Sequence, residues 1–412
     1  MSVTKSQILE QVRQIQTIAQ SMVETWDDNK TTDSSAEWST AVLQLQQAAE
    51  ELISLTASPR SVVRTLQLAH YDLVAYQVAL EFDLFTAIPA DGELSLAQVA
   101  EKAGIDEDRV ARVLRLLALH GMFQETQEDT FAHTPLSRFI SENESIRAAL
   151  GIQMDEMYQA ASSTADAIRK NPRTQDVNTS PFATRFGVSI YDFYTKYKSK
   201  ADRFGRGMMG ASSLEDEGLI SLRDCYNWAA FAGGKIVDVG GGMGHVSIFL
   251  ANAQHFPGLS FVVQDILVPP GIDTEDNKLA DNVEFQQHDF FQPQPVTDAR
   301  AYLLKHALHN HSDEDCVKVL AALVPALEAA GPKAVLLINE GVLPDYGQAM
   351  SRDQHLTLRR GDMCMMVTLS AKERTRKQFQ NLLRAADPRF KIHNVYGNAV
   401  TRLIEVYLSG SK

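Results

Sequence analysis

The 412-residue chain has few cysteines, no long apolar run and no excess of basic charge. Cys225, Cys316 and Cys364 are far apart and odd in number, which offers neither a disulfide framework nor a zinc site and fits a reducing compartment. No apolar stretch approaches the roughly 20 residues that span a bilayer, and the first residues lack a secretory signal. A net charge of −13 argues against non-specific nucleic-acid binding. We therefore expect a cytoplasmic protein that binds neither nucleic acid nor membrane.

A chain of 412 residues is too long for one ordinary core and suits several domains. Residues 1–59 predict a helical extension, because apolar residues recur at steps of three and four in two segments. These apolar stripes need a covering surface, with a partner subunit as the first candidate and the chain's own domain as the second. The stripes contain Ile8, Val12, Ile15, Ile18, Met22 and Trp26, then Trp38, Val42, Leu45, Leu52 and Leu55.

Residues 60–145 predict three helices and a β-hairpin, the order of a winged-helix domain. One helix spans 95–104 between a serine cap and a glycine, a second spans 106–121, and a hairpin spans 123–134. Helices that read DNA place Arg, Lys and Asn near their N-terminus, whereas the second helix begins with Asp-Glu-Asp. We therefore expect a dimerisation module.

Residues 146–225 predict a helical connector rich in Met, Phe and Tyr, a minority of which would line a substrate pocket.

From residue 226 to 412, strands alternate with helices, which predicts a Rossmann-like α/β domain with a mostly parallel sheet and helices on both faces. Strands are expected at 235–240, 260–265, 301–306 and 333–340, with a helix at 245–253.

The strongest motif, Val237-Asp-Val-Gly-Gly-Gly-Met-Gly244, lies between a strand and a helix. Gly240, Gly242 and Gly244 allow a sharp turn that brings the backbone close to a ligand. A histidine stands where the dinucleotide fingerprint has its third glycine. Asp238 suits a ligand with a positive amine better than a pyrophosphate, which a carboxylate would repel.

Acidic residues also follow the next two strands. Asp265 ends the second strand about 20 residues further on, where an acid typically holds ribose hydroxyls. Asp289 and Phe290 follow a further strand expected between residues 265 and 288, where an acid and an aromatic ring suit an adenine. Together with the glycine turn, these features predict a site for a nucleoside cofactor.

With these motifs, residues 60–408 resemble the class I methyltransferases, and among them the plant and fungal small-molecule O-methyltransferases with an N-terminal winged-helix dimerisation domain. The resemblance implies S-adenosyl-L-methionine as the cofactor and a homodimer. The cofactor residues that it implies are Asp265 on the ribose, Asp289 and Phe290 around the adenine, Lys305 close by and Ser212 at the methionine part.

A histidine-rich segment follows the strand at 301–306, at the sheet edge where ligands bind. His309 aligns with the general base of the family, whereas Asn310 and His311 replace the acid and the tryptophan that follow it. A base is needed because a phenol with a pKa of about 10 is weakly ionised at neutral pH, and a histidine with a pKa near 6.5 is suited to receive its proton.

By the same resemblance, Glu340 and Glu373 flank His309 and fix its tautomer. From the residues alone, Glu340 could instead be a strand-end surface charge, and Glu373 could cap the helix that starts near residue 375. No metal is expected, because His306 lies in or next to a strand whereas His309 and His311 follow it, so the three should not converge.

These observations predict an S-adenosylmethionine-dependent O-methyltransferase that acts on a phenolic or enolic hydroxyl of a small secondary metabolite. The alternative is a methyltransferase-like fungal pericyclase or dehydratase that keeps the cofactor as a fixed positive charge. Retention of the base and its two carboxylates favours methylation, whereas the altered Asn310-His311 pair keeps the alternative open. The acceptor pocket is expected to include Met154, Phe186, Met208, Asp362, Met363 and Met366.

Overall fold

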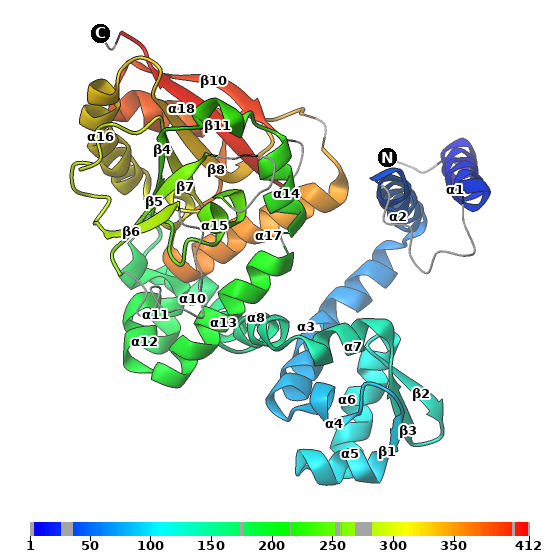
Figure 1. The fold of residues 1–412 in the computed structure, drawn as a ribbon. Coiled ribbons are helices and arrows are strands. Elements are labelled where there is room, and N and C mark those ends of the chain that lie inside the picture. The colour runs from blue at the N-terminus through cyan, green and yellow to red at the C-terminus, as the bar shows by residue number, and fades with distance from the viewer. Residues whose placement is uncertain are drawn as a thin grey trace.

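The computed structural model describes residues 4–25, 36–173, 176–214, 216–251, 256, 258–267, 282–348, 350–397 and 400–410. Figure 1 shows an α/β body, a layer of helices below it, and the N-terminal helices and a small winged domain to one side. None of the helices within these ranges combines the length and the apolar character that a membrane span requires.

The N-terminal extension forms two helices, α1 (Lys5–Thr25) and α2 (Ala36–Thr56), which pack on one another. Gln11 donates from Nε2 to the carbonyl of Ala48 at 2.9 Å across this contact. The long helix α3 (Pro59–Glu81) follows at once, after a cap by Ser58. Trp26 lies outside the described residues. Of the stripe residues that the structure describes, Met22 is buried, Val12 is exposed and the others are partly buried. Other large apolar side chains of α1, α2 and α3 are exposed: Leu9, Val23, Leu43, Ile53, Val62, Val63 and Leu66.

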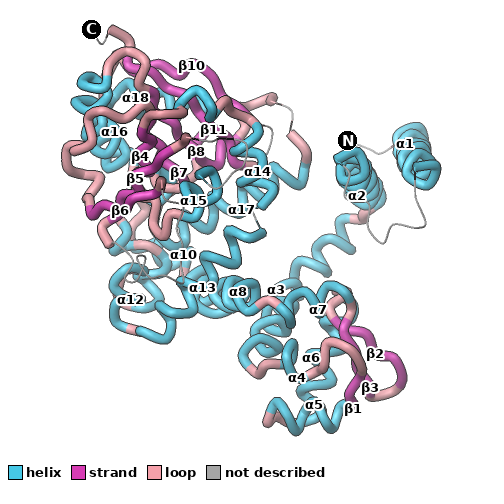
Figure 2. Tube along the Cα trace, in the orientation of Figure 1, coloured by secondary structure: helices cyan, strands magenta, loops and turns pink. Residues whose placement is uncertain are grey.

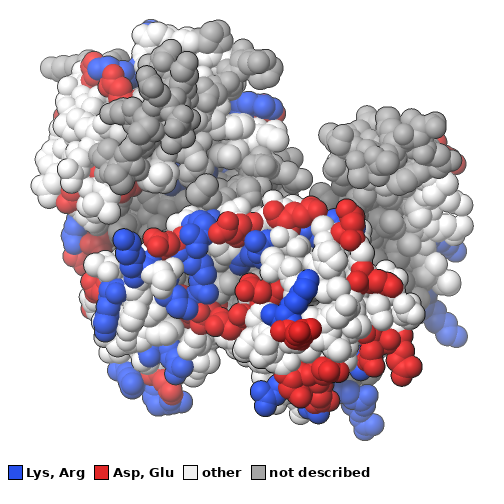
Figure 3. Space-filling model, turned by 60° about the horizontal axis from the view of Figure 1, so that its bottom comes forward, with Lys and Arg blue, Asp and Glu red and all other residues white. Residues whose placement is uncertain are grey.

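The winged domain confirms the predicted helices and hairpin. Ser95 and Gln98 form a capping box at the start of α5, Gly104 ends that helix at φ +67°, and Asp106 caps α6. Figure 3 shows acidic side chains gathered over this end of the molecule. The elements are α4 (Leu84–Ala87), β1 (Glu93–Ser95), α5 (Leu96–Ala103), α6 (Glu107–Leu119), β2 (Phe123–Gln127), β3 (Thr130–His133) and α7 (Pro135–Glu142), with strand order β1-β3-β2.

The helical layer joins the winged domain to the α/β body. Its core contains packed aromatic rings, among them Phe182, Phe186, Phe193 and Tyr194. The elements are α8 (Glu144–Ile152), the π-helix η1 (Gln153–Met157), α9 (Tyr158–Ser162), α10 (Thr164–Lys170), η2 (Val177–Thr179), α11 (Pro181–Phe186), α12 (Ile190–Lys196), α13 (Lys198–Leu214) and α14 (Asp216–Asp224).

Two glycines of α13 differ in what surrounds them. A Cβ at Gly210 would overlap the backbone of Ser145 in α8, whereas a Cβ at Gly205 would meet nothing within 4 Å. We expect Gly210→Ala to destabilise the protein by about 1–3 kcal/mol through overpacking. Gly205→Ala should be neutral or stabilising by up to about 1 kcal/mol, because alanine is the better helix former. Urea unfolding of both variants tests this, and equal midpoints would contradict it.

The α/β body contains one twisted sheet between helices (Figure 2). The strand order is β10-β11-β8-β7-β4-β5-β6, with β9 paired to β8. The pairs from β8 to β6 are parallel, while β11 runs antiparallel to β8 and β10. The sheet is therefore mostly parallel, as predicted. The strands are β4 (Lys235–Val239), β5 (Ser260–Asp265), β6 (Val283–Gln287), β7 (Ala301–Lys305), β8 (Val335–Leu343), β9 (Arg374–Thr375), β10 (Phe390–Tyr396) and β11 (Thr401–Leu408).

Apolar side chains cover both faces of this sheet, and all nine residues of β8 are buried. Because parallel strands share one carboxyl edge, the residues that follow β4, β5, β6 and β7 meet there. The helices and turns of this body are η3 (Trp228–Phe231), α15 (His245–Ala251), η4 (Leu308–Asn310), α16 (Asp313–Ala330), α17 (Arg352–Leu369) and α18 (Arg376–Ala386).

Candidate active site

The glycine turn after β4 leaves open space at the carboxyl edge of the sheet. Gly240, Gly242 and Gly244 all have positive φ angles, of 75°, 55° and 72°. A Cβ at Gly244 would lie 2.7 Å from the ring of Phe285, whereas a Cβ at Gly242 would meet nothing within 4 Å. The turn is thus packed on its inner side and open on its outer side, as a backbone that approaches a ligand requires.

Two carboxylates lie beside this turn. Asp265 accepts from the backbone N–H of Gly242 at 3.0 Å and is half-buried at the end of β5. Asp238 lies beneath the turn, 2% exposed, and accepts from Ser247 Oγ at 2.6 Å. Burial raises the pKa of Asp238 to about 6, against the opposing effects of the Ser247 hydrogen bond and the charge of Lys305.

The remaining cofactor candidates approach the turn from other strands. Phe290 packs on the turn, 3.2 Å from where a Cβ of Gly240 would be. Asp289 is exposed and accepts from the N–H of Phe291 at 3.0 Å. Lys305 ends β7 beside His306. Ser212 lies in the last turn of α13, and its side chain is outside the described residues.

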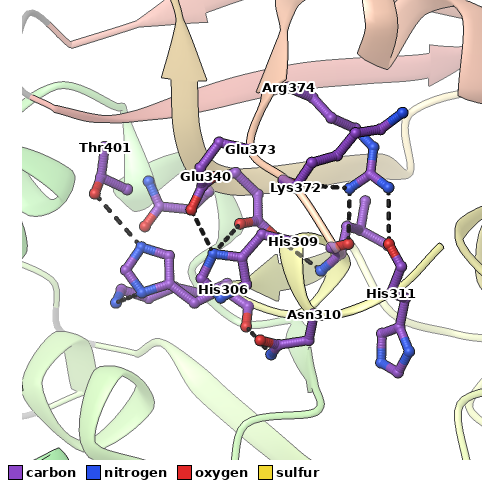
Figure 4. A network of polar contacts seen from close by, with 12 residues as sticks. His306, His309, Asn310, His311, Glu340, Lys372, Glu373, Arg374 and Thr401 are labelled. Atoms are coloured by element: carbon purple, nitrogen blue, oxygen red, sulfur yellow. Dashed lines mark hydrogen bonds and ion pairs between the residues drawn. The ribbon is translucent and has the colours of Figure 1, made fainter. Parts of the chain in front are cut away.

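His309 lies in η4 with two buried carboxylates on one side of its ring (Figure 4). Its Nδ1 is 2.8 Å from Glu373 Oε1 and 3.6 Å from Glu340 Oε2. Glu340 is fully buried on β8, and its Oε1 accepts from the N–H of Leu308 at 2.7 Å. Thr375 caps α18. The alternatives of a surface charge for Glu340 and a helix cap for Glu373 are therefore wrong.

The two carboxylates raise the pKa of His309. Burial by itself lowers the pKa of His309, but the charge of Glu340 and the hydrogen bond to Glu373 outweigh it and raise that pKa. Burial also raises the pKa of Glu340, against the attraction of His309. One ring nitrogen of His309 and one carboxylate oxygen each of Glu340 and Glu373 lie within 4.8 Å of one another, a spacing that could also hold a cation. A hydrogen bond already joins Nδ1 of His309 to Glu373, however.

The three neighbouring histidines do not converge on one point, although two of their rings lie close together. The rings of His306 and His309 stack, with centroids 5.2 Å apart and planes 20° from parallel. His306 has a φ of +49°, which sets it outside the strand geometry that the sequence pattern suggests. His311 instead places its ring against Phe290 and Phe291, with centroids 5.5 Å away in each case.

Arg374, which no sequence pattern singled out, is fully buried and holds the segment that carries His309. Its guanidinium donates to the carbonyl of Leu308 at 2.9 Å, to the carbonyl of His311 at 2.8 Å and to Asp313 Oδ1 at 3.0 Å. The sequence held no signal for this role, because two of these acceptors are main-chain carbonyls of another segment.

The acceptor-pocket candidates separate into two groups. Asp362, Met363 and Met366 lie on α17, where Asp362 accepts from the N–H of Glu373 at 3.0 Å and Met363 is 53% exposed. The other three lie in the helical layer. Met208 is exposed on α13, Phe186 packs against Phe182 with centroids 4.7 Å apart, and Met154 lines a cavity of about 190 Å³ between α3, α8 and α13.

Comparison with known proteins agrees with this architecture. The family profile of the O-methyltransferase domain matches residues 162–388, and that of the O-methyltransferase dimerisation domain matches residues 55–143. O-methyltransferase sol2 of Alternaria solani is 39% identical over 368 residues, which cover 89% of this chain and 84% of sol2. The chlorophenol O-methyltransferase of Trichoderma longibrachiatum is 29% identical over 360 residues, covering 84% of this chain and 75% of that enzyme.

Among solved structures, that of OxaC in complex with SAH and oxaline has the same fold, with a TM-score of 0.76 at 21% identity. The alignment covers 98% of this chain and 100% of OxaC. The domain match over more than half of the chain and the identity to sol2 lead to one conclusion: the chain belongs to the S-adenosylmethionine-dependent O-methyltransferases of small molecules.

Proposed function

We propose that the enzyme methylates a phenolic or enolic hydroxyl of a small secondary metabolite, with His309 as the general base. The observation that carries this proposal is the pairing of His309 Nδ1 with two buried carboxylates. Because Nδ1 is engaged, Nε2 is the nitrogen left to receive a proton. The chlorophenol O-methyltransferase among the relatives supports a phenolic acceptor.

When bound, S-adenosylmethionine would supply a methyl group that is already electrophilic, and the electron pair of its methyl–sulfur bond would stay on sulfur to give neutral S-adenosylhomocysteine. The task of the chain is therefore to ionise the acceptor. His309 Nε2 takes the hydroxyl proton, and the electron pair of the broken O–H bond stays on oxygen, which then forms the bond to the methyl carbon. Glu373 and Glu340 stabilise the imidazolium that results, in the manner of a carboxylate–histidine pair.

For the cofactor, the open side of the glycine turn is the fitting place, with Asp265 for the ribose, Asp289 and Phe290 for the adenine and Lys305 nearby.

We expect Asp265→Ala to weaken binding of S-adenosylhomocysteine about tenfold or more, because hydrogen bonds to a charged acceptor are worth about 1.5–3 kcal/mol. Calorimetric titration measures this. Asp298→Ala is the control, because that exposed carboxylate pairs with Lys235 at the opposite end of β4. Unchanged affinity in Asp265→Ala would refute the ribose role.

The pH dependence of the rate should show the raised pKa of His309. The base must be neutral to accept a proton, so kcat/KM rises with pH through a value above the ordinary 6.5 of histidine. Glu373→Gln keeps a hydrogen-bond acceptor but removes a negative charge, which lowers this pKa and moves the rising limb to lower pH. Rate profiles from about pH 5 to 9 test the shift. Glu328→Gln, on the outer helix α16, should leave the limb in place.

The direct test of function is incubation with methyl-deuterated S-adenosylmethionine and a metabolite extract of the producing organism, followed by mass spectrometry. A product that carries the deuterated methyl supports the proposal and identifies the acceptor. A metabolite that changes only in the presence of the enzyme, yet gains no label, would instead support the pericyclase or dehydratase alternative. The acceptor pocket proposed for this product includes Asp362, Met363 and Met366 on α17.

We also propose that the protein is a homodimer whose interface includes the exposed apolar side chains of α1, α2 and α3. Val62, Val63 and Leu66 on α3 are 50%, 56% and 73% exposed, within the region that matches the dimerisation domain. Analytical ultracentrifugation of Leu66→Asp beside the wild type tests this, because a buried charge at the interface should shift the protein to monomer. A monomeric wild type would contradict the proposal.

A further inference from the structure

His306 holds a backbone conformation that few residues adopt. It follows β7 directly and has a φ of +49°, in the left-handed region where only Gly, Asn, Asp and His are common. Its N–H donates to the carbonyl of Asn339 at 3.1 Å, and its own carbonyl accepts from Asn310 Nδ2 at 3.0 Å. Such a conformation is unfavourable and persists only where the surroundings fix it.

The contacts of the imidazole fix its tautomer (Figure 4). Lys305 Nζ lies 3.3 Å from His306 Nδ1, and Thr401 Oγ1 lies 3.4 Å from His306 Nε2. An ammonium group can only donate, so Nδ1 must be the bare nitrogen, and the proton of the neutral ring lies on Nε2 and is shared with Thr401. Burial, with the added repulsion of Lys305, holds the pKa of His306 well below its ordinary value.

This neutral ring stacks on the proposed base. The centroids of the His306 and His309 rings are 5.2 Å apart, within the range of favourable aromatic stacking. The hydrogen bond from His309 Nδ1 to Glu373 fixes the position of one ring nitrogen. The imidazole plane could still tilt about this fixed nitrogen, and a tilt would move Nε2. A flat ring packed against His309 restricts that tilt, and a neutral ring does so without repelling the imidazolium.

We propose that His306 is a positioning residue: locked between Lys305 and Thr401, its ring is the platform that fixes the plane of His309. The inference rests on the proposed role of His309 as base. It also gives the histidine at this position a purpose other than metal binding.

The test compares two replacements of the ring. His306→Asn keeps a residue that tolerates the left-handed backbone but removes the platform, and we expect kcat to fall roughly tenfold, since small misplacements of a catalytic group are costly. The KM of the acceptor and the affinity for S-adenosylhomocysteine should stay within about twofold, because His306 positions the base rather than a ligand. His306→Phe restores a flat ring and should recover most of kcat. Thr401→Val, which removes the partner of Nε2, should lower kcat a few-fold.

Two kinetic results would overturn the inference: a wild-type kcat in His306→Asn, or a His306→Phe variant that melts near the wild-type temperature yet is as slow as His306→Asn. Nitrogen NMR of the wild-type protein with labelled histidine gives a readout independent of activity. It should show His306 as the neutral Nε2–H tautomer from about pH 6 to 9, and a charged ring in that range would also overturn it. An unlabelled product, or full activity of His309→Ala, would instead count against the proposed function.

Discussion

His309→Ala is expected to lower the rate of methyl transfer by about 10²–10⁴-fold, the usual contribution of a positioned general base. The acceptor hydroxyl then has to lose its proton to water, and the two carboxylates that stabilise the imidazolium have nothing to stabilise. Cofactor affinity should be almost unchanged, because the proposed cofactor residues lie on the glycine turn and on the strands beyond it. Label transfer from the deuterated cofactor measures the rate, and calorimetry measures the affinity.

The matched control for this variant is His393→Ala, which removes an exposed histidine on the outer strand β10. It should methylate at the wild-type rate. If His309→Ala also methylates near the wild-type rate while still binding S-adenosylhomocysteine, then the base is another group.

Arg374→Met is expected to destabilise the fold and slow the reaction at once. The carbonyls of Leu308 and His311 would both lose the donor that Arg374 supplies and keep only the weakly donating thiol of Cys316, at 3.1 Å and 3.7 Å. We expect the loss of these two charged donors to cost about 1–3 kcal/mol in all. Asp313 is half-exposed and keeps Lys372, so we assign little of the loss to its charge. Because η4 carries His309, a loosened η4 also misplaces this proposed base. Guanidinium unfolding and the methylation rate measure the two effects.

Arg376→Met is the control, since Arg376 is exposed in the first turn of α18 and lies only two residues further along the chain. Its midpoint of unfolding should match the wild type. An Arg374→Met protein with an unchanged midpoint would mean that water replaces the guanidinium at both carbonyls.

Local sequence patterns were sufficient to predict the strands and the glycine turn that surround the site. Buried apolar runs predicted β4, β5 and β7, and glycine spacing predicted the turn that Gly240, Gly242 and Gly244 form. Asp265 followed from its place at the end of a strand. These features depend on residues near one another in sequence, and parallel strands bring their ends to one edge of the sheet.

Contacts between distant segments were not predictable in this way. Nothing in the order of residues separates a buried Glu340 from a surface charge, because its burial comes from the elements packed over β8. The stacking of His306 on His309 depends on the sign of one φ angle, and histidine adopts either sign. Arg374 donates to main-chain carbonyls of another segment, and because every residue has such a carbonyl, the sequence does not show which residues are its partners.

The double use of Glu340 has a consequence for anyone who would redesign this enzyme. One oxygen of this carboxylate holds the N–H of Leu308, and the other faces His309. A substitution of Glu340 that changes the pKa of His309, the proposed base, would therefore also remove or weaken the hydrogen bond that holds the main chain at Leu308. Any gain in reactivity would come with a more mobile η4. Glu373 has no such second duty among its described side-chain hydrogen bonds. Directed evolution of basicity should accordingly find tolerated changes at position 373 before position 340.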